Sequence, residues 1–493
     1  MNRHKLKEKM WEKLIGKSKG KQYTNKDRTN LILITFDQWR GDWGDPMKPV
    51  TELKELKALA EEGLIIERCY TSSPQCVPAR ISWLTGMRPS ESGVTYNRPL
   101  DLPGSAPSMI RELKDLGWHT AIVGKTHWSN HNIECDLREN KKRLSDLGFI
   151  ESREIAGPRA LQKVKCDITD DWEKTGVYKA HIKDLAERYK NGCNEAAWQV
   201  RESVLPNSLY PDIWIASKGI EMLQKMPTKK PWFLWISFVG PHEPFDTPKP
   251  WKGRNNNEQL PRVIKNNGWI DRLETTCETK KIRDLWKEKL KKEHTDALRL
   301  DYADHLQLLD DQLGKIIDIA KERTDYKNTA VAITSDHGEM LGDHEMLYKS
   351  TFLEPSVRVP FIYSPPQKTN QSHKNIRLLK PIGLTELIKF TIDGLHIGGK
   401  SKHIVRNCKW QNYAISEYGK EFMIVKGKIK VVYTSEGKAI WATDLEKDPE
   451  EKNNILENKN ISVACKIFRQ NRIAIRYARR RKKKGWCKIE YNK

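Results

Sequence analysis

Residues 31–38 read Leu31-Ile32-Leu33-Ile34-Thr35-Phe36-Asp37-Gln38, a continuous apolar run that ends in polar side chains. A short run of this kind is typical of a strand that is buried on both faces in a parallel sheet. Three further runs have the same form, at residues 120–124, 232–239 and 329–334. The sequence therefore predicts several buried strands, each ending in a polar cluster.

Helical patterns lie between these strands. Apolar side chains recur at helical spacing over residues 305–323, and residues 51–63 show the same period before a closing glycine. Strands that alternate with helices indicate an α/β fold with a largely parallel sheet. After about residue 395 the pattern changes to short alternating segments such as 422–425 and 429–433, which predict a small antiparallel sheet.

Six polar side chains follow the predicted strands within a few residues. In a parallel α/β sheet the ligand site lies outside the carboxyl ends of the strands, so side chains in these places meet. We therefore expect the following residues to converge: Asp37, Lys125, His127, His242, Asp336 and His337.

The cysteine Cys76 is followed at fixed offsets by Pro78 and Arg80, which gives the pattern C-x-P-x-R. Chance produces this pattern in only a few per cent of chains with this composition. A buried free cysteine before a turn is the simpler interpretation, and it suits the other cysteines of the chain. The polar clusters after the predicted strands favour a functional role for this one.

These features together resemble the type I sulfatases of the alkaline-phosphatase-like superfamily, whose nucleophile motif is C-x-P-S/A-R. The resemblance covers roughly residues 30–455. It implies a three-layer α/β sandwich with a large, mostly parallel sheet and a small C-terminal subdomain with an antiparallel sheet. The other signatures, in chain order, are Thr35-Phe36-Asp37-Gln38-Trp39-Arg40-Gly41-Asp42, Gly124-Lys125-Thr126-His127, Gly240-Pro241-His242-Glu243-Pro244, Ser335-Asp336-His337-Gly338-Glu339, Lys349 and Asp444-Leu445-Glu446-Lys447-Asp448-Pro449-Glu450.

The resemblance implies a specific chemistry for Cys76. In the family this cysteine is oxidised to formylglycine (3-oxoalanine) by a formylglycine-generating, or sulfatase-maturating, enzyme that recognises Pro78 and Arg80. The aldehyde hydrate then attacks a sulfate ester and releases alcohol and inorganic sulfate. Ala79 stands where Ser is commoner, and the recognition signal tolerates that change.

A divalent cation is also implied. Oxygen-rich ligands suit a hard ion such as Ca²⁺ or Mg²⁺. The alternative is that the two aspartates merely cap helices after their strands, which Asp does well. The expected ligands are Asp37, Gln38, Asp336 and His337, together with the modified Cys76.

The resemblance gives the remaining catalytic roles. Lys125 and Lys349 are expected to hold the sulfate oxygens, and Arg80 the hydrate. His127 is expected to act as the base when sulfate is expelled, and His242 to protonate the departing oxygen. The alternatives are solvated lysines, common in so basic a chain, a surface salt bridge for Arg80, and histidines satisfied within loops.

Charge is concentrated at the two ends of this 493-residue chain. The first 30 residues carry a net charge of +7 and residues 465–493 a net charge of +11, which leaves about +5 of the total +23 for the middle. We expect a basic N-terminal extension (1–29), a catalytic domain (30–395), a C-terminal subdomain (396–464) and a polybasic tail (465–493). The insertion at 250–295 is polar and expected at the mouth of the site.

Neither a transmembrane helix nor a secretory signal is visible, because no apolar run approaches about 18 residues and the N-terminus is charged without an apolar segment. A cytoplasmic location is therefore expected. The odd count of nine scattered cysteines fits free thiols in a reducing compartment.

Two other functions stay open at this point. Phosphonate monoester and phosphodiester hydrolases of the same superfamily also use formylglycine, although their motif C-x-G-P-x-R has an extra glycine that is absent here. A relative without activity could instead use the polybasic tail to bind a polyanion, whether nucleic acid, anionic membrane or sulfated polysaccharide. For an active enzyme, a small-molecule or carbohydrate sulfate ester is the expected substrate.

Overall fold

A computed structural model gives the fold. It describes residues 28–131, 133–189, 199–256, 260–265, 267–367, 375–393, 395, 412–457, 461–482, 489 and 491. Most of the expected N-terminal extension and the last basic residues of the expected tail, such as Lys483 and Lys484, lie outside the described residues.

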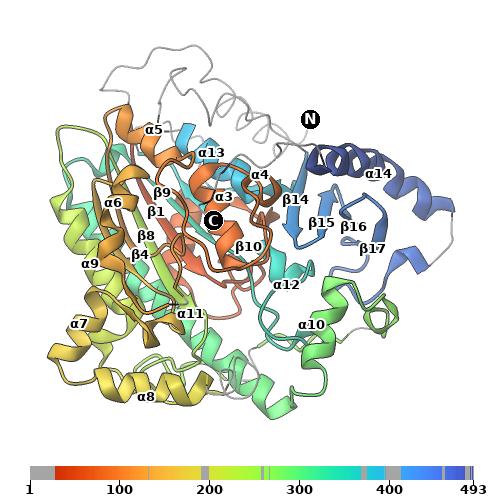
Figure 1. The fold of residues 1–493 in the computed structure, drawn as a ribbon, viewed down its shortest axis with the longest axis horizontal. Coiled ribbons are helices and arrows are strands. Elements are labelled where there is room, and N and C mark those ends of the chain that lie inside the picture. Colours follow the sequence, from red (N-terminus) through yellow and green to blue (C-terminus); the bar gives the residue numbers. More distant parts are fainter. Residues whose placement is uncertain are drawn as a thin grey trace.

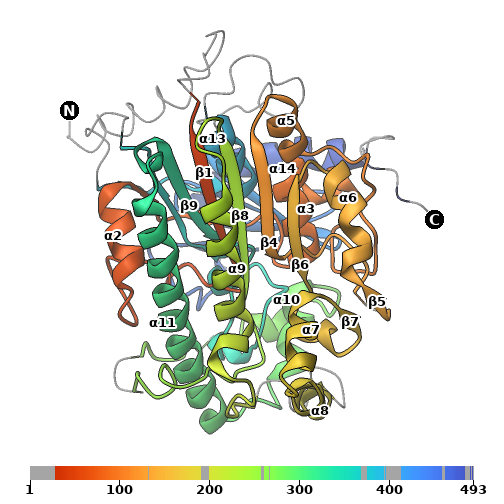
Figure 2. The same ribbon diagram turned by 90° about the vertical axis from the view of Figure 1, so that its left-hand side faces the viewer.

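The large sheet has eight strands, and it confirms the predicted α/β fold with a mostly parallel sheet. Within it only β11 runs against its neighbours. Figure 2 shows β9, β1, β8, β4 and β6 side by side. The strands, in spatial order, are β12 (Ile376–Leu378), β2 (Leu64–Ile66), β11 (Phe361–Ser364), β9 (Thr329–Ser335), β1 (Asn30–Asp37), β8 (Trp232–Pro241), β4 (His119–Lys125) and β6 (Glu151–Ile155).

Helices cover both faces of this sheet, which makes three layers. In β1, Ile32, Ile34 and Phe36 pack on one side against α2 (Lys54–Glu62), α9 (Pro211–Lys225) and α11 (Lys292–Glu322). Leu31 and Leu33 pack on the other side against α3 (Cys76–Thr85), α5 (Met109–Asp115) and α13 (Leu384–Asp393). Alternate side chains of a strand point to opposite faces, so an unbroken apolar run serves both layers.

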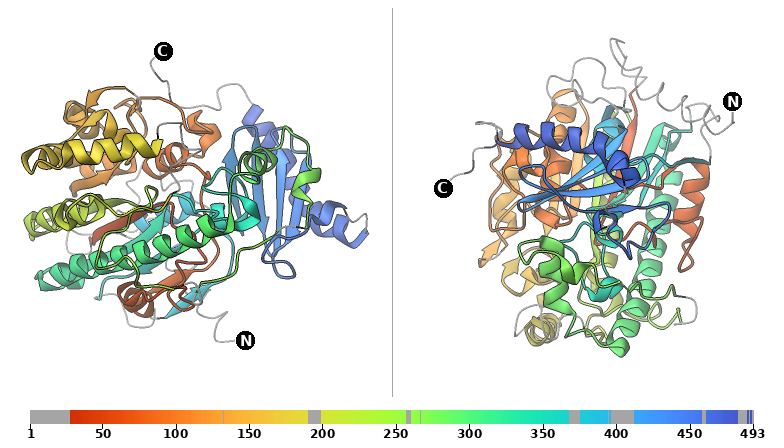
Figure 3. Two further views of the ribbon diagram at one scale, coloured as in Figure 1. Left: turned by 90° about the horizontal axis from the view of Figure 1, so that it is seen from below. Right: turned by 90° about the vertical axis from the view of Figure 1, so that its right-hand side faces the viewer.

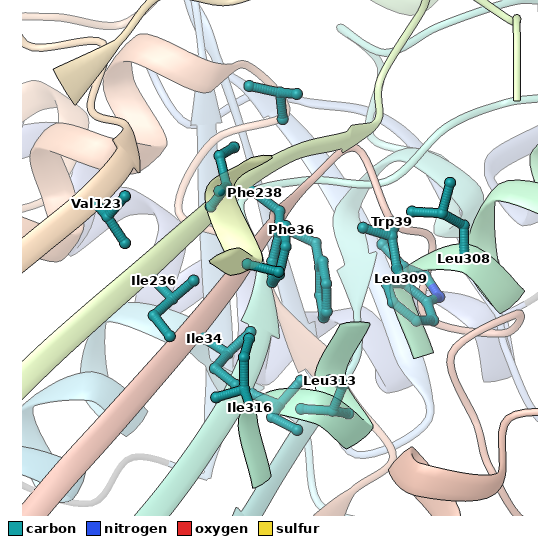
Figure 4. Close-up of a cluster of buried hydrophobic side chains, with 14 of the residues drawn as sticks. Ile34, Phe36, Trp39, Val123, Ile236, Phe238, Leu308, Leu309, Leu313 and Ile316 are labelled. Carbon is teal, nitrogen blue, oxygen red and sulfur yellow. The ribbon is translucent and has the colours of Figure 1, made fainter. Parts of the chain in front are cut away.

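The long helix α11 supplies much of the core on the first face. Figure 4 shows Leu313 and Ile316 of this helix close to Ile34 of β1, with Phe36 and Phe238 beside them. The rings of these two phenylalanines stack with centroids 5.3 Å apart. The strand ends that carry the polar clusters are therefore held in place by the apolar layer between the large sheet and α11.

A second, antiparallel sheet follows, in agreement with the expected C-terminal subdomain sheet. Its strands pair in chain order: β14 (Tyr413–Tyr418), β15 (Glu421–Lys426), β16 (Ile429–Thr434) and β17 (Ala439–Asp444). The helix α14 (Ile461–Lys482) packs on one face of it through Ala474, Tyr477 and Ala478. Figure 1 shows this sheet and α14 beside the main body. Residues 465–482, expected as a tail, thus lie in a packed helix.

Figure 3 shows the same fold from two further sides. Among the described residues, none of the helices combines the length and the apolar character needed to traverse a bilayer. Besides short 3-10 turns, the remaining α-helices and strands are β3 (Cys69–Tyr70), α4 (Pro89–Ser92), β5 (Cys135–Asp136), α6 (Lys141–Asp146), β7 (Val164–Lys165), α7 (Asp167–Lys174), α8 (Tyr178–Tyr189), α10 (Glu278–Trp286), α12 (Glu354–Val357), β10 (Arg358–Val359) and β13 (Ile382–Gly383).

The packing of α11 on the sheet predicts a large loss of stability when it is cut back. Leu313→Ala removes a side chain that is 1% exposed and leaves a cavity, so the free energy of unfolding should fall by about 2–5 kcal/mol. Asp318→Ala, at an exposed position of the same helix, should stay within about 0.5 kcal/mol of the parent. Urea titrations followed by circular dichroism measure both, and equal losses would contradict the packing described here.

Candidate active site

The carboxyl ends of four parallel strands meet at the amino end of α3. Asp37 ends β1 and Lys125 ends β4, while His242 and Asp336 come directly after β8 and β9. Cys76 is the first residue of α3. Contacts and charge interactions connect all ten residues that the sequence analysis selected: Asp37, Gln38, Cys76, Arg80, Lys125, His127, His242, Asp336, His337 and Lys349.

The C-x-P-x-R spacing is explained by the start of α3. Gln75 has extended backbone angles and precedes the helix, so Cys76 stands in the first turn, at the positive end of the helix dipole. Pro78 lies in the same turn, where a missing N–H costs nothing. Arg80 is four residues after Cys76, and residues four apart share one face of a helix. The motif therefore directs sulfur and guanidinium to the same place.

The sulfur of Cys76 lies close to a histidine, a lysine and a carboxylate. It is 3.1 Å from Nε2 of His337, 3.2 Å from Nζ of Lys349 and 3.9 Å from Oδ1 of Asp37. Burial and Asp37 act to raise the pKa of the thiol, yet Lys349, Lys125 and His337 together lower it to about 5. The site thus favours an anion at residue 76.

The guanidinium of Arg80, which is 1% exposed, connects the ends of four strands. Its charge is balanced by two carboxylates that come from neighbouring strands of the sheet. A guanidinium has a fixed fork of five N–H donors, so it can hold several acceptors in one geometry. It donates to Oδ2 of Asp336 at 2.8 Å, Oδ2 of Asp37 at 3.2 Å, the carbonyl of Lys125 at 2.7 Å and Oγ of Ser237 at 3.0 Å.

Four donor groups form a cluster that fits a metal ion. One ligand atom from each of Asp37, Cys76, Asp336 and His337 lies within 4.8 Å of all the others, and all four residues are buried. Nδ1 of His337 is 3.0 Å from the carbonyl of Gly338, which places the ring proton there and leaves the Nε2 lone pair directed into the cluster. Two carboxylates and an imidazole suit a divalent cation.

Gln38 lies beside this cluster and contacts it through its backbone N–H and through Lys349. Its Nε2 donates to Glu339 and, at 3.4 Å, to Oε2 of Glu243, so Oε1 faces the Nζ of Lys349 at 2.7 Å. The backbone N–H of Gln38 donates to Oδ1 of Asp336 at 3.1 Å. Its φ of 73° is in the left-handed region, which costs energy for a residue other than glycine and is typical of functional sites.

The two lysines occupy different sides of the cluster. Lys125 pairs with Oδ2 of Asp37, and Lys349 contacts both Gln38 and Cys76. Burial alone would raise the pKa of Asp37, but Lys125 leads the cations that hold this pKa well below its usual range. Burial opposes the charge on Lys349, yet Cys76 and Asp37 raise its pKa. The neighbouring anions thus favour the charged form of Lys349.

His127 stands beside Lys125 with a φ of 60°. Its ring stacks on that of His131 with centroids 5.3 Å apart, and its buried Nδ1 has no hydrogen-bond partner among the described residues. Burial, then the charges of Lys125 and Arg80, lower the pKa of His127 well below its usual value. The imidazole is therefore neutral and can accept a proton.

His242 is oriented by the residue that follows it. Its Nδ1 lies 2.9 Å from the carbonyl and 3.0 Å from Oε2 of Glu243, so Nε2 is the nitrogen available to a ligand. Burial and then Lys349 lower the pKa of His242 well below its usual value. An anion bound between His242 and Lys349 would offset the part of this decrease in pKa that is caused by the charge of Lys349.

Three supporting residues were not selected from the sequence. Ser237 donates to the carbonyl of Lys125 at 2.6 Å, and the carboxylates of Glu243 and Glu339 hold Gln38. Burial raises the pKa of Glu339 to about 7. A signal for each was present, because Ser237 is the one hydroxyl in the apolar run 232–239 and both glutamates stand inside polar clusters that follow strands.

Comparison with known proteins agrees with this geometry. A family model described as Sulfatase matches residues 29–385. An arylsulfatase of Clostridium perfringens is 28% identical over 466 residues, which cover 90% of this chain and 93% of that protein. A choline-sulfatase of Rhizobium meliloti is 26% identical over 461 residues, which cover 87% of this chain and 83% of that protein.

A solved structure shares the fold. The phosphonate monoester hydrolase of Agrobacterium radiobacter matches with a TM-score of 0.71 and 20% identity, covering 91% of this chain and 95% of that one. At this identity the likeness concerns the fold alone. The family model, by contrast, spans most of the chain, from the start of the first strand of the large sheet into α13, and the protein therefore belongs to the sulfatase family.

Proposed function

We propose that the protein hydrolyses a sulfate ester to an alcohol and inorganic sulfate, with residue 76 converted from cysteine to formylglycine. The observation that carries this proposal is the position of the Cys76 sulfur, 3.1 Å from His337 and 3.2 Å from Lys349, at the amino end of α3. A nucleophile there would lie next to the candidate metal cluster. In this proposal residues 30–395 form the catalytic domain and residues 396–464 the C-terminal subdomain.

The formylglycine and a divalent ion, when present, supply the nucleophilic oxygen and the positive charge that polarises the sulfate. Asp37, Gln38, Asp336 and His337, with residue 76, would hold the ion. We propose Ca²⁺, with Mg²⁺ as the second candidate, because the donors are mainly oxygen atoms. Arg80 keeps the two carboxylates in place through its hydrogen bonds to both, and it holds the hydrated residue 76.

The charge balance of the site favours an anionic substrate. Arg80, Lys125 and Lys349 carry three positive charges against the two carboxylates of Asp37 and Asp336. A bound divalent ion adds to this excess. Lys125 and Lys349 are the donors proposed to grip the sulfate oxygens, where preorganised charge stabilises the transition state most strongly.

The two histidines are proposed to move protons on opposite sides of sulfur. His242, fixed through Nδ1, presents Nε2 to the departing oxygen of the ester and is the proposed proton donor to it. His127 is neutral because burial lowers its pKa, so it can take a proton from residue 76 when sulfate is expelled.

The organic part of the ester is proposed to lie over the partly exposed side chains next to residue 76. Nε2 of Gln75 donates to Oγ of Ser350 at 2.8 Å and to the hydroxyl of Tyr418 at 3.3 Å. Tyr418 comes from β14, so the small sheet reaches the mouth of the site. The relatives named arylsulfatase and choline-sulfatase support a small-molecule or carbohydrate sulfate ester.

Hydrolysis of a phosphonate monoester is the second candidate, because an enzyme of that name shares the fold. Two observations disfavour it. The motif from Cys76 to Arg80 lacks the additional glycine expected of those enzymes. The sulfatase family model and both sequence relatives belong to the sulfatases by name.

The nucleophile is tested by mass analysis and kinetics together. In protein co-produced with a formylglycine-generating enzyme, the peptide that contains residue 76 should show the mass loss of conversion to the aldehyde. Cys76→Ala should lower kcat for 4-nitrophenyl sulfate by roughly 10³-fold or more, since the covalent route is lost. Cys135→Ala, which changes a free cysteine outside the site, should leave kcat unchanged.

Two outcomes would overturn the proposal. One is full activity from protein whose residue 76 keeps its thiol. The other is a higher kcat/KM for 4-nitrophenyl phenylphosphonate than for the sulfate, which would favour the second candidate.

Removal of the metal should lower stability. After dialysis against EDTA, the added ion should raise the melting temperature, because an ion at 100 times its Kd stabilises the folded state by about 2.7 kcal/mol. In Asp336→Asn, which lacks one carboxylate of the cluster, the same addition should produce little change. Differential scanning calorimetry with Ca²⁺ and with Mg²⁺ measures both, and an equal rise in the variant would rule out this cluster.

The role of Lys349 can be distinguished from the effect of removing any one positive charge from the protein. Lys349→Gln removes a partly buried donor 3.2 Å from residue 76 and should lower kcat by about 10²–10³-fold. Lys420→Gln removes an exposed lysine from the turn between β14 and β15 and should have no effect. Steady-state kinetics on 4-nitrophenyl sulfate gives the comparison, and a change in KM alone would exclude the proposed role.

A further inference from the structure

The outer side of α14 carries a row of exposed arginines. Arg472, Arg476, Arg479 and Arg480, here called the arginine face, are all exposed. They stand at helical positions i, i+4, i+7 and i+8, so they share one side of the helix over a length of about 12 Å. Within the part of the chain that the structure describes, none of the four has an ion pair or a hydrogen bond to another side chain.

The opposite side of α14 is firmly anchored. Ala474, Tyr477 and Ala478 are buried against the small sheet, and the hydroxyl of Tyr477 donates to the buried carboxylate of Glu417. Nε2 of Gln470 donates to the carbonyl of Ile429 at 2.8 Å. Figure 1 and the right-hand view of Figure 3 show α14 lying along the small sheet at the edge of the molecule. The arginines are thus held on a rigid support, which lowers the entropic cost of binding.

The choice of arginine over lysine is informative. The whole chain has 59 lysines and 29 arginines, yet residues 469–481 contain six arginines and no lysine. Generic basicity in this chain is supplied by lysine. The guanidinium differs in binding the oxygens of a sulfate or phosphate group through two parallel hydrogen bonds. The composition of residues 469–481 therefore indicates a partner that carries tetrahedral oxyanions rather than an undirected positive charge.

We propose that the arginine face binds a sulfated polysaccharide, so that the enzyme stays attached to a polymer whose sulfate esters it hydrolyses. The inference rests on the proposed function for the choice of polymer. Four guanidinium groups along about 12 Å match a chain that repeats its anionic groups, and each binds one of them weakly. The face lies outside the residues that surround Cys76, so it acts on attachment and not on the chemical step.

Other polyanions fit the face less well. A membrane-bound amphipathic helix inserts its apolar side into lipid, but the apolar side of α14 is already packed on the small sheet, and Ile475 is the exposed large apolar residue among its described positions. Single-stranded nucleic acid is bound with exposed aromatic rings on which bases stack. In the described part of α14, Tyr477 is the aromatic residue next to the arginines. It is only 5% exposed, so its ring is not available for stacking with a base.

The test measures binding separately from catalysis. In the full chain, Arg472, Arg476, Arg479 and Arg480 are all changed to Gln, which keeps helix propensity and removes four charges. The matched control changes four exposed lysines at the far end of the large sheet to Gln: Lys225, Lys229, Lys230 and Lys327. Circular dichroism and melting temperatures first establish that both variants are folded.

Isothermal titration calorimetry with heparin gives the affinity. Repeating the titration at NaCl concentrations between about 50 and 300 mM gives the salt dependence of the affinity, which reports how many counterions are released on binding. The arginine variant should bind heparin at least about tenfold more weakly, and the slope of log K against log[salt] should fall by roughly three to four. The lysine variant should match the parent. Duplex DNA with the same number of charges should bind the parent less tightly than heparin does.

The proposal is overturned if the arginine variant keeps the parent's heparin affinity, if the lysine variant loses as much, or if DNA competes heparin off at equal charge. Turnover of 4-nitrophenyl sulfate should be the same in parent and arginine variant. If the parent fails to hydrolyse this ester while the loss of heparin binding still follows the arginine face, the docking surface stands and the proposed function fails.

Discussion

The pairing of Arg80 with Asp37 and Asp336 is the constraint on which the rest of the site depends. The two carboxylates end adjacent strands of the sheet and are completely buried, and two such charges side by side repel each other. The guanidinium reaches them from α3 in another layer and satisfies both, while Lys125 shares the charge of Asp37. Removing one partner from a buried network of this kind costs about 3–5 kcal/mol, since a charge is left without compensation.

The small sheet is bound to this site by buried polar contacts rather than by apolar packing alone. Lys430 of β16 has no exposed surface and pairs with Glu354 at 2.7 Å and with Glu451 at 2.8 Å. Glu354 is the first residue of α12. The carbonyls of the next two residues, Pro355 and Ser356, accept hydrogen bonds from the backbone N–H groups of Glu339 and Gly338, which follow His337. The loops that carry the candidate ligands are therefore braced from the C-terminal part of the chain.

Much of the fold and the site could be predicted from sequence, because the signals were local. The apolar run before Asp37 and the fixed spacing from Cys76 to Arg80 each reflect one strand or one helix turn. The short strands β2 and β12, which lie next to each other at one side of the large sheet, could not be found, since three-residue strands have no pattern of their own and pair only through the finished sheet. The packing of α14 was hidden for a different reason: its buried residues are few and mixed, with Ile467 and Tyr477 beside two alanines, and its charge dominates the composition.

Because the C-x-P-x-R motif is buried, modification of residue 76 would have to come before folding is complete. Cys76 is 2% exposed, and Pro78 and Arg80 are enclosed with it beneath the sheet ends. A modifying enzyme can read these side chains only from a chain that has not yet closed around them. For the proposed conversion, each newly made molecule thus has a single interval in which residue 76 can be modified, and a molecule that folds first keeps the unmodified cysteine. The active fraction of a preparation would then depend on the rate of modification relative to the rate of folding.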